Sequence, residues 1–197
     1  MGKEEKGLER RLRQTINKYM REMGFHLYLI KGEVRRQSSM GDVPAFGIGV
    51  GRVGRIIVSD KLPSIVGGGG EVDFVIAHEI CHIVKGHSVV KGAHYLLNRI
   101  YLVWAPWTVF RRFLSLKPIE AFLVRGEELS ADSCAVGLTQ NKEAAISAIR
   151  KLCKFSGGNL DTPSHGMIIR EFLSGSVEST PTETFRERID NIETLQL

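Results

Sequence analysis

The stretch His78-Glu79-Ile80-Cys81-His82 has the pattern H-E-x-x-H and lies in a segment that reads as an apolar helix. Positions i and i+4 share one face of an α-helix, so the two imidazoles can bind a single metal ion. Glu79 follows the first histidine directly, where its carboxylate can reach a metal-bound water. The pattern therefore predicts a zinc hydrolase, in which His78 and His82 bind the metal and Glu79 is the general base.

The residues around this motif support a helix. An apolar set recurs at helical spacing and consists of Val72, Val75, Ile76, Ile80 and Ile83. Glu71 and Asp73 follow four glycines and place negative charge in the first turn, where the helix dipole favours it. Gly86 is a suitable C-terminal stop. His87 lies beyond that glycine, so we interpret it as a surface or capping histidine rather than as a further ligand.

A catalytic zinc needs a third protein ligand and an open position for water. The acidic run at 127–132 supplies the candidates. Glu128 and Asp132 are four residues apart and share one helical face, which suits Glu128 as the ligand. Asp132 can then accept a hydrogen bond from the free N–H of one zinc histidine. Glu127 could exchange roles with Glu128, but the spacing to Asp132 favours Glu128. We expect the site to hold one zinc ion.

Several segments resemble the HtpX-like metalloproteases, which are gluzincins related to the CAAX prenyl proteases and the soluble minigluzincins. The similar segments are 43–47, 54–62 and the histidine-bearing helix with the Lys-Gly-His sequence that follows it. The family also pairs H-E-x-x-H with a downstream E-x-x-A-D element, which residues 128–132 match position by position. In all, the resemblance covers roughly 43–92 and 126–190.

The resemblance implies zinc, proteolytic activity, and a substrate held in extended form along an edge strand that contains Ala45, Phe46 and Gly47. It also makes Arg188 a candidate for stabilising the transition state. His165, in a loop flanked by glycine and proline, is another candidate. His94 and Tyr95 are weaker ones.

The chain also differs from the family pattern. It has no membrane helix at its N-terminus, and cysteine occupies position 81, where the family often has glycine. We expect Cys81 to be a small buried residue. The His-Pro that usually precedes the Arg-Ile pair at 188–189 is missing. The expected function is therefore a zinc-dependent endopeptidase that cleaves polypeptides. The alternative is a zinc-binding, inactive or latent member of the same fold that acts as an interaction module.

Length and composition indicate a single metalloprotease domain over 1–197, since 43% hydrophobic and 25% charged residues are typical of a globular chain. An amphipathic helix is expected within 1–24, a strand over 25–34, a polar loop over 35–42 and a glycine-bearing strand over 47–54. The predicted fold class is α+β. A small antiparallel or mixed sheet packs on a helical zincin core that contains the H-E-x-x-H helix and the downstream E-x-x-A-D helix.

An inserted apolar segment, 93–124, separates the two halves of the predicted metal site. Its uncharged run, 100–110, is bounded by arginines and is shorter than the ~20 residues that span a bilayer. Pro106 would also kink a helix there. Two tryptophans and the flanking arginines suit peripheral membrane contact through 95–113, a lid or a subunit contact. A core helix is an equal alternative.

The net charge of +5 comes from dispersed basic residues, and no nucleic-acid-binding module is recognisable. We therefore expect no nucleic-acid partner. Three cysteines at irregular spacing predict no disulfide framework, which favours a reducing compartment. The N-terminus lacks the apolar core of a signal peptide. A cytoplasmic location is expected, with membrane association as the alternative.

Overall fold

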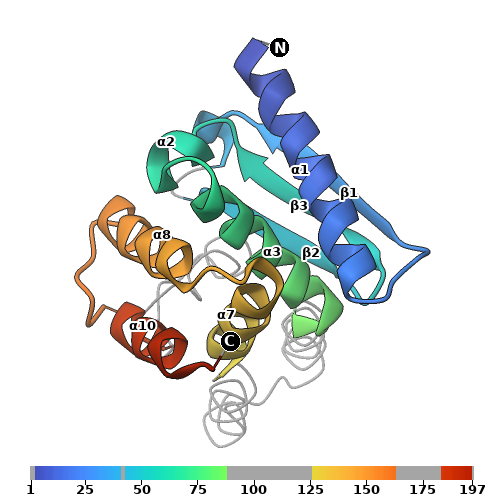
Figure 1. Ribbon diagram of the computed structural model, residues 1–197. Helices are drawn as coiled ribbons and strands as arrows, with labels where there is room; N and C mark the ends of the chain where they lie inside the picture. The colour runs from blue at the N-terminus through green and yellow to red at the C-terminus, as the bar shows by residue number, and fades with distance from the viewer. Residues whose placement is uncertain (1–2, 41–42, 88–125, 163–182, 197) are drawn as a thin grey trace, which may run out of the picture.

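The computed structural model describes residues 3–40, 43–87, 126–162 and 183–196, which form an α+β fold (Figure 1). A small mixed sheet packs against helices, as the sequence predicts. In chain order the elements are α1 (Lys3–Glu22), β1 (Leu29–Arg35), the short 3-10 helix η1 (Gln37–Ser39), β2 (Ala45–Val50), β3 (Val53–Ser59), α2 (Leu62–Val66), α3 (Gly70–Val84), α7 (Glu127–Thr139), α8 (Lys142–Phe155) and α10 (Phe185–Thr194).

The described strands form a sheet of order β1-β3-β2, in which β1 is parallel and β2 antiparallel to β3. The glycine-rich stretch forms two strands rather than the one predicted, because the chain turns between Val50 and Val53. Gly51 in that turn has a φ of 58°, a left-handed conformation that costs glycine little. β2 is an edge strand of this sheet and contains Ala45, Phe46 and Gly47.

β1 begins later than the predicted strand at 25–34. Gly24 adopts a φ of 79° at the end of α1, and the backbone N–H of Phe25 donates to the carbonyl of Met20. The residues that follow therefore connect the helix to the sheet before β1 begins at Leu29.

α1 packs against β1. Its predicted apolar face is buried at Leu8, Leu12, Ile16 and Tyr19, with Met23 just beyond the helix partly buried. Gly32 in β1 lies under this face, where a Cβ would be only 2.6 Å from Cγ of Leu12. Glycine at position 32 therefore lets the helix and the strand pack closely.

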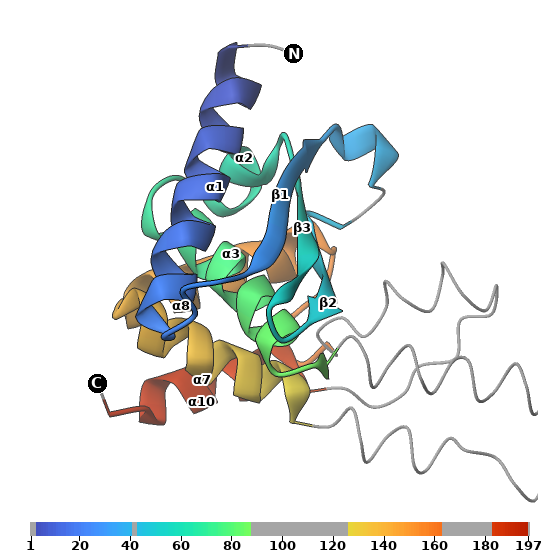
Figure 2. The ribbon, with the colours of Figure 1, turned by 90° about the vertical axis from the view of Figure 1, so that its right-hand side faces the viewer.

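α3 is the central helix, with the sheet and α1 on one side and α7 and α8 on the other (Figures 1 and 2). The apolar residues that predict this helix are all buried, namely Val72, Val75, Ile76, Ile80 and Ile83. Ion pairs attach its first turn to neighbouring helices. Asp73 accepts hydrogen bonds from Arg11 of α1, and Glu71 accepts one from Lys151 of α8 at 2.9 Å.

The C-terminal helices begin at defined caps. The side chain of Asn141 accepts a hydrogen bond from the N–H of Ala144 at the start of α8. Thr184 and Glu187 form a reciprocal capping box at the start of α10. α10 packs against both α7 and α8, and this places Arg188 beside α7.

A disulfide joins α3 to α7 between Cys81 and Cys134, whose Cα atoms are 6.2 Å apart. The prediction that the cysteines form no disulfide is therefore wrong, and Cys81 is not simply a small buried residue. The 53-residue separation carries no local signal, because the two positions meet only when the helices pack. Cys153 is a buried free thiol. With this bond present, the cysteines no longer favour a reducing compartment.

Removing the bond is expected to lower the free energy of unfolding by about 4 kcal/mol, the chain-entropy value for a loop closed over 53 residues. Denaturant unfolding of the wild type with and without reductant measures this change. A double Cys81→Ala and Cys134→Ala variant is the control, because its unfolding should not respond to reductant. Three titratable thiols in the denatured, unreduced protein would contradict the bond.

The predicted insert at 93–124 and its proposed membrane contact at 95–113 lie outside the described residues, as does His165. None of the described helices is both long enough and apolar enough to cross a membrane.

Candidate metal centre

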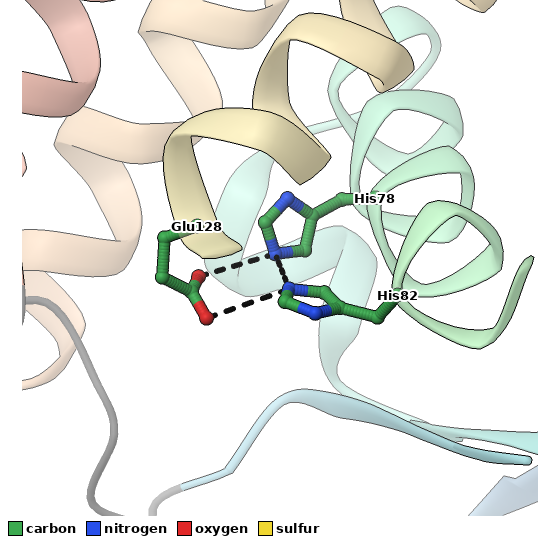
Figure 3. Close-up of side chains that lie close together, drawn as sticks. All are labelled: His78, His82 and Glu128. Atoms are coloured by element: carbon green, nitrogen blue, oxygen red, sulfur yellow. Dashed lines mark hydrogen bonds and ion pairs between the residues drawn. The ribbon is translucent and has the colours of Figure 1, made fainter. Parts of the chain in front are cut away.

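Three buried side chains from two helices point at one another (Figure 3). His78 and His82 come from α3, and Glu128 comes from the first turn of α7. The Nε2 atoms of the two histidines are 3.0 Å apart. Oε2 of Glu128 lies 3.3 Å from Nε2 of His78, and its Oε1 lies 3.4 Å from Nε2 of His82. The structure therefore brings together the three residues that the sequence predicts as metal ligands.

These spacings fit a tetrahedral metal ion. Bonds of about 2.0–2.1 Å from a central zinc place neighbouring ligand atoms about 3.3 Å apart. The measured distances join the two Nε2 atoms to each other and each of them to a different oxygen of Glu128, and all three are close to that edge length. Three protein ligands would leave a fourth position for water or substrate. Within the described residues, His78, His82 and Glu128 form the group of possible metal ligands whose donor atoms converge in this way.

Local structure explains this convergence. The spacing of four along α3 puts both imidazoles on the helix face that meets α7. Contacts outside the cluster also hold that pair of helices together. They include the Cys81–Cys134 disulfide and the Lys85 ammonium, which donates to the carbonyl and hydroxyl oxygens of Ser130.

Asp132 contacts His78, the first histidine of the motif. Its Oδ1 is 2.8 Å from Nδ1 of His78, so it can accept the N–H of that ring while Nε2 faces the other ligands. Arg188 reaches Asp132 from α10 with Nε at 2.6 Å and Nη2 at 2.7 Å. Its Nη1 lies 3.3 Å from Oε2 of Glu128. Arg188 therefore contacts both carboxylates at once, which the sequence pattern does not indicate.

The pKa values reflect this network. Burial lowers the pKa of His78, but the hydrogen bonds and charges of Asp132 and Glu128 outweigh it and raise this pKa to about 9. Burial raises the pKa of Glu128. The charge of His82, hydrogen bonds from both histidines and the charge of Arg188 outweigh burial and hold this pKa well below its usual range. At neutral pH the protonated ring of His78 and the guanidinium of Arg188 therefore balance the two ionised carboxylates, and a metal cation would replace the proton of His78.

Glu79 lies beside β2, outside the ligand triangle. A Cβ on Gly47 would lie 3.0 Å from the carbonyl oxygen of Glu79 and 3.2 Å from its Oε2. The edge strand therefore passes close to the predicted general base, and a side chain at position 47 would press on it. Glu127 is buried in the same turn as Glu128 but is not part of the triangle.

His87 is partly buried and packs against His82, a contact that its interpretation as a surface or capping residue does not include. Its Nδ1 lies 2.9 Å from Nδ1 of His82. Gly86, with a φ of 74°, turns the chain after α3, so that His87 lies against His82. The glycine indicates the turn in the sequence, but nothing in the sequence indicates that His87 contacts His82.

An H-E-x-x-H helix packed between a small mixed sheet and a carboxylate-bearing helix is consistent with the zincin class of metal-dependent hydrolases. Comparison with protein families supports this class. Residues 7–195 match the model of Peptidase family M48, and the chain therefore belongs to that family. Its members are metalloproteases, which indicates metallopeptidase activity. A search of curated proteins found no match.

Proposed function

We propose that the protein is a zinc-dependent endopeptidase with one zinc ion held by His78, His82 and Glu128. The observation that carries the proposal is that one donor atom from each of these three buried residues lies within 4.8 Å of the other two. When bound, zinc supplies a Lewis acid that activates water and polarises the scissile carbonyl. The ligand set of two histidines and one glutamate is one that catalytic zinc sites use.

Glu79 is the proposed catalytic base. It follows His78 on α3 and is only partly buried, so its carboxylate can exchange protons in the site. It accepts a proton from the attacking water and then delivers it to the leaving amine of the substrate. This transfer leaves Glu79 ionised and ready for the next cycle.

The substrate proposed for this site is an extended polypeptide that lies along β2. The closeness of Gly47 to Glu79 supports this position, because a chain aligned with β2 would present its carbonyl groups near the base. Ala45 and Phe46 precede Gly47 on the same edge strand. Backbone hydrogen bonds to β2 require a substrate whose main chain is extended, so unfolded segments are the expected substrates.

Asp132 and Arg188 are proposed to organise the ligands. Asp132 fixes the tautomer of His78, and Arg188 balances the charge of Asp132 and Glu128. A role for Arg188 in stabilising the transition state stays a prediction, since its three nitrogens already contact these carboxylates. The same role for His165 also stays a prediction.

Within the M48 family, the segments similar to HtpX-like enzymes support a place near that branch. The E-x-x-A-D element at 128–132 and the stretch at 54–62 carry this part of the proposal. Peripheral membrane contact through 95–113 stays a prediction, as does a cytoplasmic location.

Metal analysis combined with cleavage of unfolded casein tests the proposed function. The purified wild type should contain one zinc per chain and cleave casein, lose that activity on treatment with a chelator, and regain it when zinc is restored. A protein that binds one zinc but leaves casein intact would instead support the inactive or latent alternative. A protein that stays empty when offered zinc would overturn both.

A further inference from the structure

His82 has a partner on the side of its ring that faces away from the other ligands. Its Nε2 points into the ligand triangle, and its Nδ1 lies 2.9 Å from Nδ1 of His87. The two ring centroids are 4.9 Å apart, with a 74° angle between the planes. This edge-on approach directs the nitrogen of one ring at the nitrogen of the other, as a hydrogen bond requires.

The protonation pattern of this pair follows from the proposed zinc site, on which the inference rests. A neutral imidazole that binds metal through Nε2 carries its proton on Nδ1. His82 is then the donor, and His87 must accept through an unprotonated Nδ1 and carry its own proton on Nε2. We propose that His87 is a positioning residue that fixes the tautomer and ring plane of His82 in this way.

The contact between His87 and His82 resembles the contact between Asp132 and His78. His78 is held through Nδ1 by Asp132 at 2.8 Å, so each ligand ring has an acceptor behind it. The acceptors differ in charge, because Asp132 is an ionised carboxylate that Arg188 also contacts, whereas His87 accepts as a neutral ring. His87 is not itself a ligand, since it contacts the nitrogen of His82 that faces away from the triangle.

Three substitutions at position 87 test the inference. In His87→Asn, the short amide places an oxygen near the position of Nδ1. In His87→Gln, the longer side chain places it nearer that of Nε2. His87→Ala removes both. His26→Ala is a matched control, because His26 is exposed.

The primary measurement is zinc affinity by competition with a chelator. The visible absorption spectrum of the cobalt-substituted protein reports ligand geometry, and thermal unfolding of the zinc-free protein reports packing. His87→Ala and His87→Gln should weaken zinc binding by roughly 10–100-fold and shift the cobalt spectrum. His87→Asn should restore most of the affinity, and His26→Ala should match the wild type.

Zinc affinity of His87→Ala equal to that of a zinc-binding wild type would overturn the inference and leave the proposed function intact. A loss that Asn does not rescue, accompanied by weaker thermal stability of the zinc-free protein, would show that His87 only packs and would also overturn it. If the wild type binds no zinc, the proposed function and this inference both fail.

Discussion

A Glu79→Gln variant is expected to lose peptidase activity by roughly 10²–10⁴-fold while it keeps its zinc. Glutamine has nearly the same shape but cannot accept a proton from water at neutral pH. The substitution therefore removes the proton transfer without emptying the space beside Gly47 of β2. Cleavage of casein and zinc content, measured on the same preparation, separate the loss of the base from a loss of metal.

Glu143→Gln is a suitable control for that experiment. Glu143 is exposed in the first turn of α8 and undergoes the same chemical change. It should cleave casein as the wild type does. Activity of Glu79→Gln within a few-fold of the control would refute the assignment of Glu79 as general base, even if the protein proves to be a zinc peptidase.

The second large effect is expected at the third ligand. A Glu128→Gln variant should bind zinc far more weakly than the wild type, by more than the ~10–100-fold typical of a residue that contacts a ligand only indirectly. The amide keeps the size of the side chain but removes the charge that faces both histidines. Competition with a chelator gives the affinity, and casein cleavage should fall with zinc occupancy.

Glu127→Gln provides the matched comparison, because Glu127 is the adjacent residue in the same helical turn and is also buried. Its zinc affinity should stay within a few-fold of the wild type. If the two variants exchange these results, Glu127 is the ligand and the geometry of the triangle is wrong. If both bind zinc normally, the metal site does not use this helix.

The part of the site that depends on helical periodicity could be predicted from sequence. His78 and His82 share a face of α3 because four residues separate them, and Glu128 and Asp132 share a face of α7 for the same reason. The buried faces of α1 and α3 follow from the same repeat. Each of these predictions needs only the local geometry of one helix.

Contacts between separate helices and strands could not be predicted from helical periodicity. The Cys81–Cys134 bond, the approach of Arg188 to two carboxylates and the return of His87 to His82 each depend on how separate segments pack. The glycines of the stretch 47–54 likewise show that the chain can turn but not at which residue. The sequence shows where a turn or a contact is possible, but which of these forms depends on how the elements pack in the folded chain.

The disulfide between α3 and α7 also determines what happens when the backbone is cleaved. Cys81 and Cys134 flank the whole stretch between the two ligand-bearing helices. Under oxidising conditions, a single cut in the backbone anywhere within that stretch would release no fragment, and both halves of the ligand set would remain covalently attached. A nicked protein of this kind would run as one species until a reductant separates it.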